Sequence, residues 1–147
     1  VPGALPPLMG WAAASGSLSA EAWILFGVLF LWQIPHFLAI AWMYRDDYEA
    51  AGIRVLPVVE RDGVWTAALM VLFVLATLGV SLLPVRFGVG GSAYMMVAAA
   101  LGGAFLIPAI GFSVERSTSS ARRVLLASVL YLPAILAVMV GIRLPVA

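Results

Sequence analysis

The sequence contains no cysteine, no lysine and a single histidine, His36. Without cysteine the chain can form no disulfide and offers no thiolate to a metal. Only 10% of its 147 residues are charged and 64% are hydrophobic, whereas about a quarter of a soluble domain is charged. This composition excludes a soluble globular domain. The net charge of +1 says nothing about nucleic acid, and we expect no nucleic-acid partner.

The sequence also lacks a recognisable start. Val1 is not a methionine, and no basic segment precedes a short apolar stretch as in a signal peptide. Residues 1–14 are apolar but shorter than the about 20 residues that cross a bilayer. We therefore expect a fragment that lacks its N-terminal part, or a processed product. Residues 1–14 would end a truncated helix that Pro6 and Pro7 kink or break.

Long apolar runs dominate what is present. They cover residues 22–44, 64–85, 92–114 and 124–142, each about the length of a membrane span. The sequence predicts an all-α fold: a polytopic transmembrane helix bundle with four complete spans and a truncated first one, forming a single membrane domain over 1–147. Ser19 is expected to cap the first complete span, with Glu21 in its first turn. Gly102 and Gly103 would let neighbouring helices approach closely.

The arginines indicate the orientation in the membrane. Three lie in the loop segment 45–63 and three in the segment 115–123, whereas residues 15–21 have none, and residues 86–91 and the C-terminus have one each. Basic residues favour the cytoplasmic side. We expect a multi-pass protein of the cell inner membrane in a lipid bilayer, with both arginine-rich segments cytoplasmic and the C-terminus outward.

Polar residues concentrate between Trp32 and Pro57. If residues 33–47 form one helix, His36 and Asp47 share a face and lie about 16 Å apart along the axis, at roughly 1.5 Å per residue. An imidazole would then lie deep in the apolar layer, with a carboxylate pair at its edge. This arrangement suits a ligand with an anionic head and a long apolar body.

The acidic pair Asp46 and Asp47 suits a hard cation. Mg²⁺ takes one or two carboxylates and completes its shell with water and substrate phosphates. Arg45 and Arg54 could add positive charge toward the same phosphate oxygens. The alternative is a solvated loop beside the membrane, whose charges only set topology.

His36 lies inside a predicted span, where ionisable groups are costly and usually functional. It could ligate an iron, hold a polar edge of a ligand or move a proton. The alternative is a structural histidine bonded to a neighbouring helix. Gln33, one turn away, could be its partner or a second polar contact.

Four aromatic side chains flank the same predicted face. Aromatic rings can stabilise an allylic cation through their quadrupoles. The alternative is a belt at the membrane interface, which we favour for part of the set and for two further tryptophans. The four are Trp32, Trp42, Tyr44 and Tyr48; the belt is favoured for Trp42 and Tyr44 and for Trp23 and Trp65.

The run PHFLAIAWMYRDDYEAAGIRVLPVV resembles the signature of protohaem IX farnesyltransferases (haem O synthases), intramembrane prenyltransferases of the UbiA superfamily. The matching residues are Pro35-His36-Phe37, Asp47-Tyr48, Ala51-Gly52 and Leu56-Pro57-Val58. The opening GALPPLMGWAAASG resembles the segment that precedes this signature in the family. The resemblance covers the whole chain, although the last three spans match only in hydropathy and spacing.

The resemblance implies a bundle of nine transmembrane helices around a central cavity, of which this chain would supply the truncated fifth to the ninth. It implies transfer of a farnesyl group from farnesyl diphosphate to a vinyl group of haem B, giving haem O for haem–copper oxidases. Ionisation of the diphosphate would come first. The implied catalytic residues are Asp47, Asp46, Arg45 and Tyr48, with both aspartates holding Mg²⁺. The implied substrate-binding residues are His36, Gln33, Tyr44 and Arg54.

The family's first acidic motif, N-D-x-x-D-x-x-x-D, is absent, and the sequence contains no N-D pair. The resemblance places this motif in an N-terminal half of the same protein, which would be missing here. Half of the implied diphosphate site is therefore missing, and we expect the 147 residues alone to be inactive. Two alternatives stay open. One is a UbiA-type prenyltransferase with a quinone or chlorin acceptor. The other is a non-catalytic transporter or assembly protein. Its expected feature is a matched broken helix in a second half, and the sequence shows none.

Overall fold

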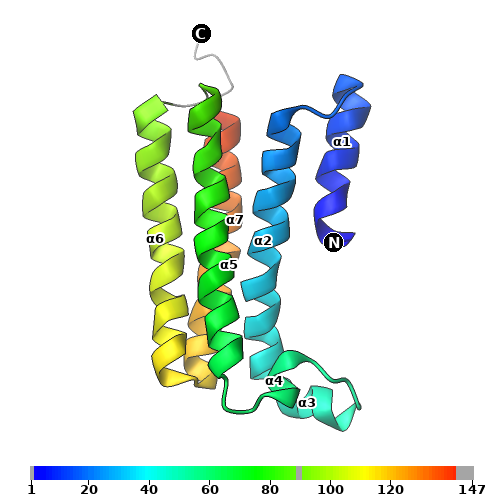
Figure 1. The fold of residues 1–147 in the computed structure, drawn as a ribbon, viewed down its shortest axis with the longest axis vertical. Coiled ribbons are helices and arrows are strands. Elements are labelled where there is room, and N and C mark those ends of the chain that lie inside the picture. Colours follow the sequence, from blue (N-terminus) through cyan, green and yellow to red (C-terminus); the bar gives the residue numbers. More distant parts are fainter. Residues whose placement is uncertain (1, 89–90, 142–147) are drawn as a thin grey trace.

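The computed structural model describes residues 2–88 and 91–141, and over these residues every regular element is helical. The predicted all-α class is confirmed. Figure 1 shows the elements in chain order. They are η1 (Pro2–Ala4), α1 (Leu5–Ser15), α2 (Ala20–Met43), α3 (Arg45–Ala50), α4 (Leu56–Val59), α5 (Val64–Leu82), η2 (Leu83–Phe87), α6 (Gly91–Glu115) and α7 (Thr118–Gly141).

Four helices of the described chain are long and apolar enough to cross a membrane: α2, α5 continued by η2, α6 and α7. Each packs on two others, so that α2, α5, α6 and α7 form a closed bundle. The short helix α1 lies beside α2, outside this bundle (Figure 1).

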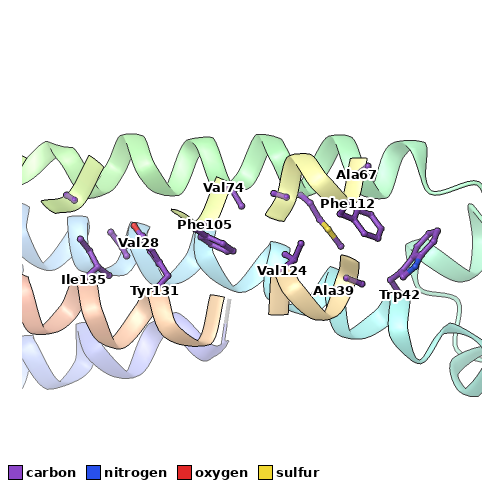
Figure 2. Packing of buried hydrophobic residues seen from close by; sticks show 14 of the residues in the cluster. Val28, Ala39, Trp42, Ala67, Val74, Phe105, Phe112, Val124, Tyr131 and Ile135 are labelled. Carbon is purple, nitrogen blue, oxygen red and sulfur yellow. The ribbon is translucent and has the colours of Figure 1, made fainter. Parts of the chain in front are cut away.

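The core runs along the centre of the bundle (Figure 2). Its aromatic rings pack edge-on or tilted: Trp42 and Phe112 are 5.1 Å apart at 86°, and Phe105 and Tyr131 are 5.3 Å apart at 32°. Small residues fill the spaces between these rings, as close packing of helices requires. The other buried members are Val28, Ala39, Ala67, Met70, Val74, Tyr94, Ala98, Ala109, Ala121, Val124 and Ile135.

Helix α6 packs closely against α5 at Gly102. A Cβ placed on Gly102 would collide with the side chain of Leu78, whereas one on Gly103 would meet nothing within 4 Å. Of the two adjacent glycines, only Gly102 allows this packing.

Two expectations about helix starts are wrong. Pro6 and Pro7 do not interrupt a helix but lie in the first turn of α1, where the N–H that proline lacks would have no helical partner anyway. Ser19 occupies the N-cap position of α2, but its hydroxyl makes no capping bond. Instead the hydroxyl is buried and without a hydrogen-bond partner among the described residues.

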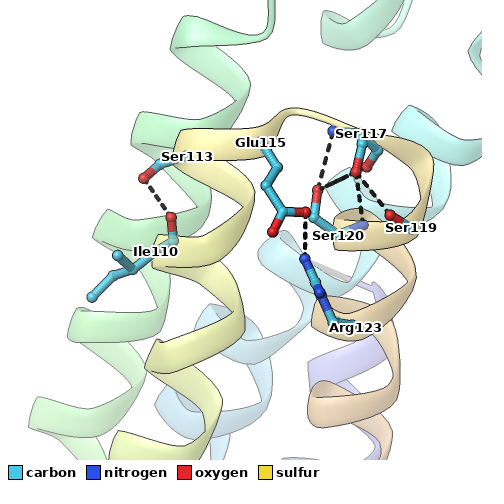
Figure 3. A network of polar contacts seen from close by, with 7 residues as sticks. All are labelled: Ile110, Ser113, Glu115, Ser117, Ser119, Ser120 and Arg123. Carbon is cyan, nitrogen blue, oxygen red and sulfur yellow. Dashed lines mark hydrogen bonds and ion pairs between the residues drawn. The ribbon is translucent and has the colours of Figure 1, made fainter.

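The segment 115–123 is mostly helix rather than loop, because α7 already begins at Thr118. Ser117 and Ser120 explain the early start: the Ser120 N–H donates to Ser117 Oγ, and the Ser117 N–H donates to Ser120 Oγ, both at 3.1 Å (Figure 3). This exchange is a capping box with serine in both positions. Glu115 and Arg123 pair beside it. The predicted end of the last span, residue 142, lies outside the described residues.

Candidate functional site

The segment 45–63 folds into α3, α4 and their connections at one end of the bundle (Figure 1). A single helix over residues 33–47 is not formed. Helix α2 ends at Met43, and Tyr44 has φ −112° and ψ 24°, outside the helical region. The predicted common face of His36 and Asp47 is therefore wrong. The two residues belong to separate helices.

Helix α3 ends at Ala50 and is followed by a Schellman motif at Gly52. The Ile53 N–H donates to the Tyr48 carbonyl at 2.8 Å, and the Gly52 N–H donates to the Glu49 carbonyl at 2.9 Å. This ending needs a left-handed residue, and Gly52 has φ +71°. The Ala51-Gly52 part of the motif thus has a structural reason, and it turns the chain back toward the bundle.

Leu56, Pro57 and Val58 begin the short helix α4, which packs against α2. Pro57 is fully buried. It lies in the first turn, where a missing N–H is tolerated. The Leu-Pro-Val part of the motif therefore fastens the segment to the bundle.

Arg61 gathers two of the acidic side chains. It pairs with Glu49, and its Nη2 lies 3.8 Å from Asp46 Oδ1. All three side chains are more than half exposed. Asp47 is also exposed, and its carboxylate makes no hydrogen bond or ion pair within the described chain. Of the two predicted metal-binding aspartates, Asp47 is thus the one with no competing cation.

Arg45 points to a ring rather than to the carboxylates. Its guanidinium carbon lies 4.5 Å from the centroid of Trp42, a cation–π contact. Trp42 is 3% exposed and packs in the core, so the belt interpretation is wrong for Trp42. Tyr44 is 51% exposed, and Tyr48 is half-buried.

Arg54 lines a groove of about 430 Å³ together with Glu49, Gly52, Ile53, Val58 and Val59. This groove lies between the end of α3 and α4. Arg54 and Arg45 are thus on different parts of the segment.

Glu60 and Asp62 secure the start of α5. Glu60 accepts the Trp65 N–H at 2.8 Å, and the Thr66 N–H and hydroxyl at 3.1 and 3.0 Å. Burial opposes ionisation, but hydrogen bonds from Asp62, Trp65 and Thr66 outweigh it and lower the pKa of Glu60. The hydrogen bond to Glu60 raises the pKa of Asp62. The Glu60 carboxylate therefore has a structural role, since it satisfies N–H groups that a helix start leaves free.

The two polar connections meet. Arg116, between α6 and α7, donates from Nη1 to the Asp62 carbonyl at 3.3 Å. Arg116 has φ +45°, a left-handed conformation that reverses the chain after α6. The segments 45–63 and 115–123 therefore lie at the same end of the bundle, as their arginine content predicts.

His36 contacts α7. Its Nδ1 lies 2.8 Å from Ser128 Oγ, and Trp32 stacks on the imidazole with ring centroids 4.8 Å apart. The Trp32 Nε1–H donates to the Ser128 carbonyl at 2.8 Å. The Nδ1 atom of His36 thus makes the bond to a neighbouring helix that the structural alternative predicted.

Gln33 faces a different neighbour. Its Oε1 would lie 3.1 Å from a Cβ on Gly3, and its side chain is 8% exposed. It thus packs against η1, whereas His36 packs against α7. The predicted pairing of Gln33 with His36 is not formed.

The opposite end of the bundle holds an apolar cavity of about 390 Å³. Side chains of α1, α2, η2, α6 and α7 line it. They are Pro7, Trp11, Glu21, Ile24, Leu25, Leu29, Pro84, Tyr94, Leu136, Met139 and Val140. None of the predicted site residues lies in this cavity.

Three contacts of the candidate site were missed in the sequence: Ser128 as the partner of His36, Arg61 as the partner of the acidic side chains, and Glu60 as the cap of α5. Ser128 gave a weak signal, since a polar residue in an apolar span commonly bonds across helices. Arg61 gave none beyond its charge.

The residues present fit a magnesium ion only in part. Across residues 2–88 and 91–141, no group of three or more His, Cys, Asp or Glu side chains is placed to hold a metal. Asp46 and Asp47 are the two adjacent carboxylates, which is the number that Mg²⁺ takes when substrate phosphates fill its other positions.

Comparison with known proteins gives the family. Residues 1–140 match the UbiA prenyltransferase family. A protoheme IX farnesyltransferase of Solibacter usitatus is 49% identical over 139 residues, which are 95% of this chain and 48% of that protein. That of Koribacter versatilis is 48% identical over 145 residues, 94% of this chain and 47% of that protein. That of Salinibacter ruber is 49% identical over 139 residues, which are 95% of this chain and 49% of that protein.

The chain thus spans about half the length of the curated relatives that it matches. No solved structure matches it significantly. The family match extends over almost the whole sequence, including the helices whose packing was described above. The chain therefore belongs to the UbiA prenyltransferase family.

Proposed function

We propose that this chain is part of a membrane enzyme that transfers a farnesyl group from farnesyl diphosphate to a vinyl group of haem B. The observation that carries the proposal is the exposed, unpaired carboxylate of Asp47 at the end of an apolar bundle, within a segment whose motif residues shape α3 and α4. Three relatives at 48–49% identity are named protoheme IX farnesyltransferases, which supports it.

In this reaction the C–O bond of the diphosphate breaks, and the farnesyl carbon bonds to the terminal vinyl carbon. Water adds to the other vinyl carbon, and its proton leaves with the diphosphate. Asp47, with Asp46 beside it, would hold Mg²⁺, which neutralises charge on the diphosphate when bound. Arg54 adds positive charge at the same end of the bundle. The apolar helices keep bulk water from the carbocation.

Residues outside the 147 complete the site in this proposal. Support comes from the length of the relatives, which is about twice that of the chain, and from the small number of carboxylates placed together here. The 147 residues alone should then form no product. We further propose that the protein lies in the cell inner membrane with the segment 45–63 in the cytoplasm, where the diphosphate substrate is available.

The test uses the complete protein in membranes with farnesyl diphosphate, haem B and Mg²⁺, and mass spectrometry of the haem products. Asp47→Asn should lower product formation by about 100-fold or more, the cost of losing one key electrostatic contact. Glu115→Gln is the matched control, because Glu115 is a carboxylate at the same end whose partners among the described residues are Arg123 and Ser117 of the α6–α7 connection.

Retained turnover in Asp47→Asn would mean that this carboxylate only sets topology. If the protein prenylates an added quinone and not haem B, the proposed acceptor is wrong and a quinone is the acceptor.

A further inference from the structure

Ser128 of α7 connects two side chains of α2. It is fully buried. Its carbonyl accepts the Trp32 Nε1–H at 2.8 Å, and its Oγ lies 2.8 Å from His36 Nδ1 and 2.6 Å from the Leu125 carbonyl oxygen. These contacts determine the protonation of the imidazole.

A serine hydroxyl carries one hydrogen. The Leu125 carbonyl can only accept, so this hydrogen is committed to it. In this arrangement Ser128 Oγ accepts from His36, with the proton on Nδ1. The neutral imidazole carries a single ring proton, so Nε2 keeps its lone pair.

The ring is also fixed in orientation and accessible. Trp32 stacks on it at an interplanar angle of 26°, and the indole is itself held by Ser128. Nε2 has no hydrogen-bond partner among the described residues. It is not buried either, since the partnerless buried side-chain atoms there are Ser19 Oγ and Tyr131 Oη. Nε2 is therefore the ring atom that is open to a ligand.

We propose that His36 binds the iron of the porphyrin acceptor through Nε2, and that Ser128 is a positioning residue that fixes the required tautomer. The proposal rests on the proposed function. Histidines that ligate metals almost always donate their other N–H to an oxygen, as His36 does here. His36 lies seven residues before the end of α2 at Met43, about 10 Å along the axis. The porphyrin would thus lie within the apolar layer, deeper in the bundle than the diphosphate.

The first experiment titrates the complete protein in detergent with ferric haem B and follows the absorption and electron paramagnetic resonance spectra. His36→Gln should lose the iron–nitrogen signature. Ser128→Ala should weaken haem binding by about 10- to 100-fold, as for other residues that orient a metal ligand. Ser128→Thr keeps the hydroxyl and should behave as wild type.

Ser81→Ala is the matched control. Ser81 is also fully buried, and its hydroxyl donates to the carbonyl three residues earlier, Leu78, at 2.8 Å. It contacts no histidine in the described chain. Ser81→Ala should therefore leave haem binding unchanged, whereas a general cost of removing a buried hydroxyl would affect both variants.

Nitrogen-15 NMR of the histidine ring reads the tautomer without haem, with His36→Gln used to assign the signal. The Nδ1–H form should dominate in wild type and Ser128→Thr, and the two forms should mix in Ser128→Ala. A dominant Nε2–H form in wild type would overturn the proposal, as would an unchanged iron–nitrogen signature in His36→Gln.

Failure of this inference is distinguishable from failure of the proposed function. If wild type prenylates haem B and His36→Gln binds haem equally well with the same spectrum, only the inference fails. If wild type binds no haem, both fail.

Discussion

At the scale of single residues, Glu60 shows how the polar segment is fastened to the bundle. Its carboxylate accepts hydrogen bonds from two backbone N–H groups and one hydroxyl in the first turn of α5. The N-terminus of a helix favours a negative charge. Glu60 therefore stabilises the junction between the candidate site and α5.

Glu60→Ala should destabilise the protein by about 1 kcal/mol, the usual cost of losing a helix cap. Because hydrogen bonds lower the pKa of Glu60 in the folded state, its contribution is present above the ordinary carboxyl pKa. It fades as the pH falls through the lowered pKa. Thermal unfolding in detergent from pH 7 to pH 3 measures this difference.

The comparison is made in an Asp62→Asn background, because the raised pKa of Asp62 acts in the opposite direction. Glu115→Ala, which removes an exposed ion pair with Arg123, should cost less, as surface pairs contribute little. An equal loss in both variants would mean that Glu60 contributes only surface charge.

The sequence indicated His36 as unusual but could not identify its partner. A histidine in an apolar run is visible in one dimension. Ser128 lies 92 positions away, and its contact depends on how α2 and α7 rotate against each other. The tautomer could not be predicted without that rotation, whereas the stacking on Trp32 joins two positions four apart on α2.

At the scale of elements, the apolar runs predicted the long helices, because a membrane span requires an unbroken run of apolar residues. Their ends were less predictable. Helix α7 starts at Thr118 because of the reciprocal bonds of Ser117 and Ser120. A hydropathy pattern does not reveal such bonds. Helix α2 ends at Met43 although the helical spacing continues to Asp47.

Gly102→Ala should destabilise the α5–α6 pair by about 1–3 kcal/mol, the range for overpacking, because its Cβ would collide with Leu78. Gly103→Ala, the neighbouring position with open space around it, should be neutral or slightly stabilising, since alanine favours helix. Denaturation followed by circular dichroism measures both.

Leu78→Ala combined with Gly102→Ala should recover part of the loss, because the smaller side chain makes room for the methyl group. If Gly102→Ala is as stable as Gly103→Ala, the approach of the two helices does not depend on Gly102.

At the scale of the whole molecule, the polar groups are distributed unequally between the two ends. One end carries α3, α4 and the α6–α7 connection, joined by Arg116 and the Asp62 carbonyl. The other end carries the apolar cavity. The arginine count predicted that the two polar segments share an end. They do so because alternate loops of an antiparallel bundle lie at the same end. It gave no information about the cavity, which packing creates.

Single cysteines test the proposed orientation, since the chain has none of its own. In the complete protein without other cysteines, Ser119→Cys should react with a membrane-impermeant thiol reagent only in inverted vesicles. Ser17→Cys should react in intact cells with a permeable outer membrane. Both positions are exposed. The reverse pattern would place the segment 45–63 outside the cytoplasm.

Trp42 gives the bundle a built-in optical probe. Its indole touches Phe112 of α6 and the guanidinium of Arg45 in α3, and it lies directly against Gly63 at the entrance to α5. A cation over the ring and a backbone beside it both affect indole fluorescence. Movement of the segment 45–63 relative to the bundle would therefore change the emission of Trp42, which can be read without an attached dye once the other four tryptophans are replaced.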